Sequence, residues 1–195
     1  MLPKIFSSNP IVSRKLVPIF FILGVLVSSC TPATQVPGIT PTQPGVIDTA
    51  QTFSSDALGL CFSYPQGYLQ IPYNDTVEIV APEIPGSELR GLFWLEKSDA
   101  YDRTAQVIAD QDVSMVPGLN PGRSTLTLGG EKAVVLDGMP GQDFTRKVYI
   151  VHEKTLYILT FTPTLSENVA AGDQMEVLFT AVTSSWAWSP CPAGK

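Results

Sequence analysis

Short segments in which apolar and polar residues alternate fill most of the chain between residues 57 and 162. Alternation with a period of two is typical of β-strands, and clusters of glycine and proline between the segments indicate turns. The pattern predicts strands at residues 58–64, 68–71, 76–80, 89–96, 123–128, 132–136, 144–151 and 155–162.

The last of these segments is apolar on both of its faces. Leu156 and Ile158 lie on one face, and Tyr157, Leu159 and Phe161 lie on the other. A strand with apolar side chains on both faces has to be covered on both. We therefore expect residues 155–162 to form a central strand of the sheet.

Two further segments show helical spacing. Residues 99–112 form the first, with Ser98 as the expected N-cap and Ile108 on its apolar face. The second lies near the C-terminus, where Asp173 and Glu176 resemble a capping box. Its apolar residues recur at helical spacing: Met175, Leu178, Phe179, Val182 and Trp186. This helix is expected to lie across the sheet.

The N-terminal segment has the pattern of a lipoprotein signal. Positive residues precede an apolar run of about 12 residues (16–27), which is shorter than the ~20 that a membrane-spanning helix needs. Small residues then lead directly to Cys30 in the sequence Leu-Val-Ser-Ser-Cys. We expect cleavage before Cys30 and modification of its thiol with diacylglycerol, with a further acyl chain such as palmitate on the new amino group. The alternative is a secreted protein with an incidental cysteine at the cleavage site.

Charge limits the partners of the processed protein. The formal charge of −6 falls to about −9 when Lys4, Arg14 and Lys15 leave with the signal. An acidic protein gains nothing from counterion release on a polyanion, so we do not expect it to bind nucleic acid. Attraction to anionic headgroups is excluded in the same way, and contact with the lipid bilayer is expected through the anchor alone.

A proline- and threonine-rich segment separates the anchor from the alternating strands. Residues 31–50 contain four prolines, five threonines and no aromatic residue, which predicts a flexible, disordered linker. We therefore expect three parts: a signal peptide (1–29), the lipidated cysteine with its linker (30–50), and one globular domain (51–195). The expected location is the cell membrane or the outer membrane, with the domain extracytoplasmic.

Two cysteines remain once Cys30 carries lipid. Cys61 lies in the first expected strand, and Cys191 lies five residues after Trp186 at the end of the last helix. Outside the cytoplasm such a pair usually oxidises, and the ends of a domain often lie close together, so a Cys61–Cys191 disulfide is expected. The alternative is two unpaired buried thiols.

A search for reactive groups finds no catalytic constellation. The single histidine, His152, is expected at a hairpin tip beside Glu153 and Lys154. We interpret it as a polar turn residue, because no nucleophile and orienting carboxylate are predicted near it. Asp110-Gln111-Asp112 lacks the spaced oxygen ligands and glycine of a calcium loop. One histidine without a paired thiol motif does not make a zinc site, and no phosphate-binding loop occurs. No catalytic residue, metal ligand or cofactor is predicted.

The closing segment Ser-Trp-Ala-Trp-Ser-Pro-Cys contains Trp186 and Trp188. Exposed tryptophans can mark a partner site. The other interpretation is that they pack the closing segment against the core, beside the expected disulfide.

The order of elements resembles the PsbP-like family over roughly residues 55–190. The resemblance rests on Phe-Ser-Tyr-Pro-Gln-Gly-Tyr at 62–68, Leu-Gly-Gly-Glu-Lys-Ala at 128–133, the hairpin at 148–161 and Ser-Ser-Trp at 184–186. It implies an α+β fold, an α/β/α sandwich around a mainly antiparallel sheet. It also implies binding or assembly roles on larger complexes, and it transfers no site residues.

The expected function is that of a non-enzymatic, membrane-anchored lipoprotein whose domain binds another envelope component. Two alternatives stay open: an envelope hydrolase that uses His152, and a solute-binding accessory of a transporter.

Overall fold

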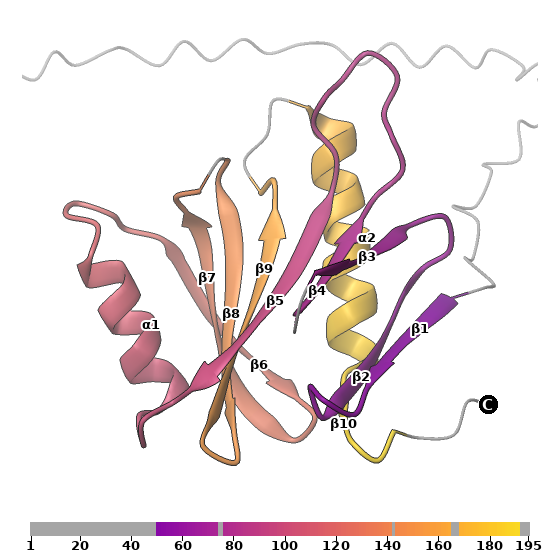
Figure 1. Ribbon diagram of the computed structural model, residues 1–195. Coiled ribbons are helices and arrows are strands. Elements are labelled where there is room, and N and C mark those ends of the chain that lie inside the picture. Colours follow the sequence, from indigo (N-terminus) through magenta and orange to yellow (C-terminus); the bar gives the residue numbers. More distant parts are fainter. Residues whose placement is uncertain (1–49, 74–75, 142, 165–167, 192–195) are drawn as a thin grey trace, which may run out of the picture. The chain divides into compact units, whose positions relative to one another are not determined.

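The computed structural model describes residues 50–73, 76–141, 143–164 and 168–191 (Figure 1). Cys30, the signal peptide and residues 31–49 of the linker lie outside the described residues. The described part of the chain contains two helices and ten strands. In chain order they are β1 (Ala50–Ser55), β2 (Leu60–Pro65), β3 (Leu69–Tyr73), β4 (Thr76–Val80), β5 (Leu92–Asp99), α1 (Ala105–Ser114), β6 (Gly122–Leu128), β7 (Glu131–Met139), β8 (Thr145–His152), β9 (Thr155–Thr162), α2 (Val169–Ser185) and β10 (Ala187–Trp188).

The strands form two sheets in which every pairing is antiparallel. Seven strands pair in the order β3-β4-β5-β9-β8-β7-β6, and three pair in the order β1-β2-β10. β9 lies between β5 and β8, at the middle of the large sheet. The predicted central position of residues 155–162 is therefore confirmed.

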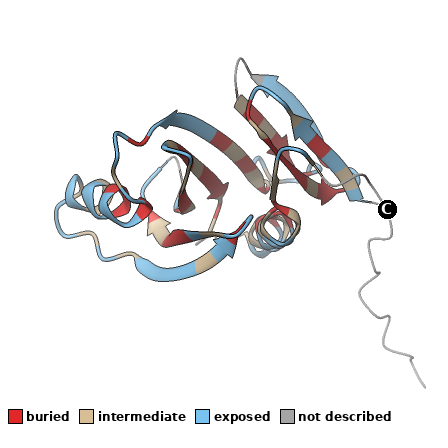
Figure 2. Cartoon of the chain, turned by 90° about the horizontal axis from the view of Figure 1, so that it is seen from below, coloured by how far each residue is buried: buried red, intermediate tan, exposed pale blue. Residues whose placement is uncertain are grey.

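The two helices pack on opposite faces of the large sheet. α1 contacts β7 and β8, whereas α2 contacts β2, β5 and β9. Side chains of β9 alternate between them, since Leu156 is buried with α1 and Leu159 with α2. Figure 2 shows many buried positions in the strands, while α1 buries Ala105, Ile108 and Ala109 and exposes half of its residues. The larger core therefore lies on the α2 face, between the two sheets.

A close approach of β5 to α2 depends on a glycine. A Cβ atom on Gly91 would lie 2.8 Å from the backbone nitrogen of Met175. The Gly91 backbone N–H donates to Gln174 Oε1 at 3.0 Å, which joins the start of β5 to the helix. Nearby, the rings of Phe62 and Trp186 stack with their centroids 5.8 Å apart. These contacts close the α2 side of the core.

The expected start of the first helix is wrong. Ser98 and Asp99 continue β5 and pair with Leu156 and Thr155 of β9. α1 begins six residues later than expected, at Ala105, where the Thr104 hydroxyl accepts a hydrogen bond from the Val107 N–H at 3.3 Å. Backbone pairing with β9 decides the difference, because a residue held in a ladder is unavailable as a helix cap.

The capping box expected at the second helix is also wrong. α2 begins at Val169, and the Asn168 side chain accepts from the Ala171 N–H at 3.3 Å. Asp173 is therefore inside the helix. Glu176 instead pairs with Arg146 across the sheet surface, at 2.8 Å.

Other boundaries shift for related reasons. Neither β1, which starts at Ala50, the last residue of the expected linker, nor β10 was predicted from the sequence. The strand expected at 89–96 forms at Leu92–Asp99, and β7 continues to Met139 through an irregularity where a turn was expected. The α+β class with antiparallel strands and two helices is confirmed, whereas the sequence did not predict a second sheet. None of the described helices has the length and apolar character needed to cross a bilayer.

Candidate functional site

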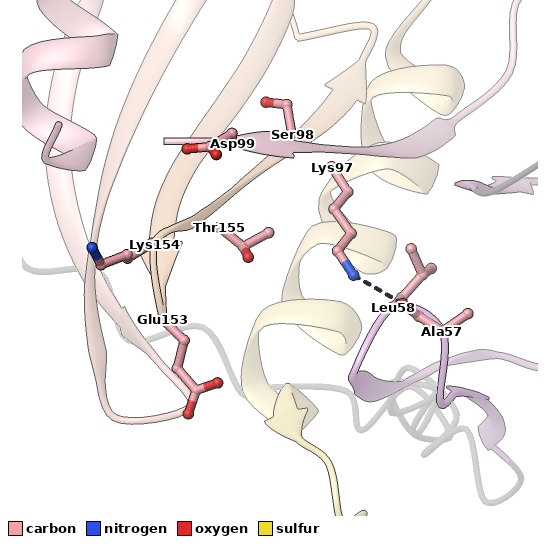
Figure 3. A pocket seen from close by; sticks show the side chains of 8 residues that line it. All are labelled: Ala57, Leu58, Lys97, Ser98, Asp99, Glu153, Lys154 and Thr155. Atoms are coloured by element: carbon pink, nitrogen blue, oxygen red, sulfur yellow. Dashed lines mark hydrogen bonds between the residues drawn. The ribbon is translucent and has the colours of Figure 1, made fainter. Parts of the chain in front are cut away.

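A cavity of about 660 Å³ lies between the β1–β2 turn, the end of β5 and the β8–β9 hairpin (Figure 3). Ala57 and Leu58 come from the β1–β2 turn. The end of β5 contributes Lys97, Ser98 and Asp99, and the β8–β9 hairpin contributes Glu153, Lys154 and Thr155. These segments are far apart in the sequence, and the sheet pairing brings them together.

Lys97 crosses this cavity. Its ammonium group donates to the carbonyl oxygen of Ala57 at 2.8 Å and lies 5.8 Å from the ring centroid of Tyr157. The Tyr157 hydroxyl donates to the carbonyl oxygen of Leu58 at 2.9 Å. Burial, followed by the charge of Glu153, raises the pKa of Tyr157. The β1–β2 turn is thus held against the large sheet by two side chains.

The hairpin at the other side of the cavity has an unusual backbone. Glu153 and Lys154 have φ angles of 46° and 69°, as the central residues of a two-residue hairpin turn require. The Lys154 carbonyl accepts from the Ala100 N–H at 2.9 Å, and its ammonium lies 3.0 Å from Asp102 Oδ1. Figure 3 shows the Lys154 side chain directed away from the β1–β2 turn. With Lys97 and Lys154 beside Asp99 and Glu153, the wall of the cavity carries both positive and negative charge.

The chemistry of this cavity is that of a polar binding surface. Its eight lining residues include two lysines, two carboxylates and two hydroxyls, but no histidine or cysteine. A serine or threonine hydroxyl needs an adjacent base to act as a nucleophile. Asp99 and Glu153 are the lining groups that can act as such a base, but among the described residues no hydrogen bond joins either carboxylate to the hydroxyl of Ser98 or Thr155.

His152 lies at the end of β8, outside the lining of the cavity. Its ring stacks on Trp188 with centroids 4.1 Å apart and planes 4° apart, and its Nδ1 is 3.2 Å from Glu131 Oε1. The sequence predicted a polar turn residue, but the side chain is partly buried and packs on the closing segment. The Glu131 carboxylate is placed to orient the imidazole, and neither of these two contacts supplies a hydroxyl or thiol nucleophile.

The two aspartates of Asp110-Gln111-Asp112 have separate partners. Asp110 lies 2.6 Å from Arg123, whereas Asp112 lies 3.0 Å from Lys147. Hydrogen bonding from Gln106, with a further contribution from Arg123, lowers the pKa of Asp110. Within the described ranges, no group of three His, Cys, Asp or Glu side chains is placed to hold a metal ion.

Asp112 also accepts a hydrogen bond from Tyr149, which sequence reasoning missed. The Tyr149 side chain is fully buried, and burial, together with the nearby Asp112 carboxylate, raises its pKa. Asp112 therefore joins α1 to β8 through both Tyr149 and Lys147. A period-two pattern assigns Tyr149 to a face but does not identify its partner.

Arg146 forms a second polar link, on the opposite face. Its guanidinium lies 2.9 Å from Asp137 and 2.8 Å from Glu176, and it packs over the ring of Phe179 at 4.4 Å. These contacts join β7, β8 and α2. Both links stabilise the packing of helices on the sheet.

The disulfide is present. Cys61 of β2 and Cys191, which follows β10, are bonded, with their Cα atoms 6.0 Å apart. Cys61 is buried, and its neighbour in the ladder is Ala187 of β10. The bond therefore fastens the C-terminal segment to the small sheet.

The two tryptophans pack the closing segment, as the second interpretation predicted. Trp186 is buried against Phe62, and Trp188 is partly buried between His152 and Tyr157. A Cβ atom at Gly129, whose φ is +53°, would lie 2.5 Å from the Trp188 indole nitrogen. The turn before β7 thus needs glycine for close contact with Trp188.

Comparison with known proteins gives similarity at the level of structure only. No protein-family model and no curated protein matches the chain. The chain is similar to the solution structure of cyanobacterial PsbP (CyanoP) from Synechocystis sp. PCC 6803, with a TM-score of 0.49 and 15% identity over 77% of this chain and 99% of that one. It is also similar to a crystal structure from Bacteroides thetaiotaomicron, with a TM-score of 0.48 and 11% identity over 70% of this chain. The match spans about half of the Bacteroides chain, 47% of its length.

Proposed function

We propose that the protein is a membrane-anchored extracytoplasmic lipoprotein whose PsbP-like domain binds another envelope component and does not catalyse a reaction. The anchor would be lipid on Cys30, and residues 31–49 would link it to the domain. The observation that carries the proposal is the Leu-Val-Ser-Ser-Cys sequence at 26–30, directly after a short apolar run.

The disulfide supports the extracytoplasmic location independently. Cysteine pairs oxidise and persist in oxidising compartments and are rare in the cytosol. The Cys61–Cys191 bond joins two elements of the small sheet, which is the pattern of a structural bond. Because Cys61 and Cys191 bond to each other, the Cys30 thiol is left for lipid.

The packing of the reactive residues supports a binding role. His152 is engaged by Trp188 and Glu131, and no hydrogen bond among the described residues joins a carboxylate of the cavity to either of its hydroxyls. The hydrolase alternative makes a separate prediction, because it requires His152→Ala to abolish activity. The Glu131 carboxylate could orient His152 in such a reaction, but no described hydroxyl or thiol forms a hydrogen bond with the His152 ring.

Labelling tests the anchor. Cells that express the full chain are grown with radiolabelled palmitate, and the protein is compared with its Cys30→Ser variant. We expect label and membrane association in the parent, and neither in the variant. Label that persists in the variant, or a parent without label, would contradict the proposal. Cys61→Ser/Cys191→Ser is the matched control, because it removes two thiols and keeps Cys30.

A further inference from the structure

Among the described residues, no helix packs on one half of a face of the large sheet. α1 packs on β7 and β8, and the same face continues over β9, β5, β4 and β3. The pairing register places Ile71, Glu78, Trp94 and Thr160 side by side across four strands, followed by Lys147. Lys147 pairs with Asp112 of α1, which shows that the whole row belongs to the α1 face.

The row becomes exposed toward its β3 end, whereas Thr160 of β9 is buried. Leu69 and Ile71 on the edge strand β3 have 62% and 41% of their surface exposed, and Trp94 is half-buried. A hollow of about 280 Å³ lies on this face, lined by Thr76, Glu78, Trp94 and Glu96. Apolar side chains and an aromatic ring beside a hollow are typical of protein-binding surfaces.

The charge of the hollow is uniform. Among the described residues, neither Glu78 nor Glu96 forms an ion pair, whereas the Asp112 carboxylate on the same face is 3.0 Å from Lys147. Glu78 lies directly opposite Trp94 in the ladder, and Glu96 follows Trp94 two residues later on the same face. Two carboxylates therefore flank one indole, and neither is paired with a cation in the part of the chain that the structure describes.

This arrangement favours a planar cation. A guanidinium group can stack on an indole and donate paired hydrogen bonds to carboxylates at the same time. A lysine ammonium is a compact charge without the planar fork, and an apolar side chain would leave the carboxylates without compensation.

We propose that this surface, defined as Leu69, Ile71, Glu78, Trp94 and Glu96, binds a partner protein through an arginine side chain. The arginine stacks on Trp94 between Glu78 and Glu96, and apolar residues of the partner contact Leu69 and Ile71. The inference rests on the proposed binding function and names the surface that performs it.

Fluorine NMR tests the cation site directly. The full chain, labelled with 5-fluorotryptophan and held in detergent micelles, has three tryptophan signals, and Trp94→Phe identifies the relevant one. The probe is the peptide acetyl-Gly-Arg-Gly-amide, with its lysine and citrulline twins as controls. We expect a saturable shift of the Trp94 signal with the arginine peptide, a smaller one with lysine and none with citrulline.

Charge variants decide whether the carboxylates carry the binding. Glu78→Gln/Glu96→Gln should weaken arginine-peptide binding at least fivefold, whereas Glu83→Gln/Glu88→Gln, the same charge change on the β4–β5 loop, should leave it within twofold. Equal weakening by both variants would mean a general charge effect and would overturn the site. Equal shifts with the lysine or citrulline peptide would overturn the guanidinium assignment.

Photo-crosslinking in the native membrane separates the surface from the function. p-Benzoylphenylalanine is placed at Ile71 and, as a control, at Val107, which is 50% exposed on α1. We expect a protein adduct at Ile71 that is lost with Glu78→Gln/Glu96→Gln and is absent at Val107. Capture at Val107 alone would overturn this surface and leave the proposed function standing. No capture at either position would count against both the surface and the proposed binding function. An adduct between two copies of this chain would overturn the proposal that the partner is a different protein.

Discussion

Removing the Cys61–Cys191 disulfide tests how the C-terminal segment contributes to stability. The bond joins residues 130 apart in the sequence, across the whole domain. In the chain-entropy relation, closing a loop of this length destabilises the unfolded chain by about 5 kcal/mol. Cys61→Ser/Cys191→Ser should therefore lower the free energy of unfolding by about that amount.

The native state should change little, because other contacts keep the segment in place. Ala187 and Trp188 pair with Cys61 and Leu60 of β2, and Trp186 stacks on Phe62. The loss of stability should thus come from the greater freedom of the unfolded chain.

Urea unfolding followed by tryptophan fluorescence measures the effect. With a denaturant slope of about 2 kcal/mol per molar, a loss of about 5 kcal/mol moves the midpoint down by roughly 2–3 M urea. Reductant should move the parent to the same midpoint and leave the variant unchanged. A variant within about 1 kcal/mol of the oxidised parent would refute this reasoning.

Three further predictions follow from single contacts. Gly129→Ala should lower the free energy of unfolding by about 1–3 kcal/mol and change the near-ultraviolet circular dichroism of Trp188, because the added Cβ would lie 2.5 Å from its indole nitrogen. Tyr149→Phe should cost about 1–2 kcal/mol in urea unfolding, since it removes a buried donor to Asp112, whose side chain is 35% exposed. Burial raises the pKa of Tyr68 to about 12, so its contribution to stability is complete below pH ~10 and is lost as pH rises from there through about 12. Tyr68→Phe should make the alkaline fall of the urea midpoint shallower.

Each of these has its own control. Gly130→Ala carries a positive φ of +89° but no atom within 4 Å of the new Cβ, so it should cost less than Gly129→Ala. Equal losses would show that contact with Trp188 is not the cause. For Tyr149, an unchanged free energy of unfolding in Asp112→Asn would contradict the assignment of the loss to the hydrogen bond between Tyr149 and Asp112. For Tyr68, an unchanged alkaline profile in the phenylalanine variant would contradict the pKa argument.

Much of the strand framework could be predicted from local patterns. Alternation located β4, β6, β8 and β9 to within a few residues, because which face a side chain occupies depends only on its neighbours in the strand. The two apolar faces of β9 also predicted its central place in the sheet. The Cys61–Cys191 pairing was predictable because compartment and cysteine count left a single pair.

Helix starts and short strands could not be predicted in the same way. Ser98 has the chemistry of an N-cap, but its backbone is engaged by β9, so Thr104 caps α1 instead. β10 has only two residues and exists because β2 offers it a pairing edge. Where α1 begins and whether β10 forms therefore depend on backbone partners that are distant in the sequence.

The surfaces were decided by tertiary structure alone. The amino-acid sequence by itself determined the predicted anchor at Cys30, the α+β class and the central strand, since each follows from residue type and local order. Only the folded chain placed Glu78 opposite Trp94, and neither of the two described helices packs on that face of β3, β4 and β5. The physical reason is register: pairing between strands sets which side chains become neighbours, and α1 is long enough to cover only one end of the sheet.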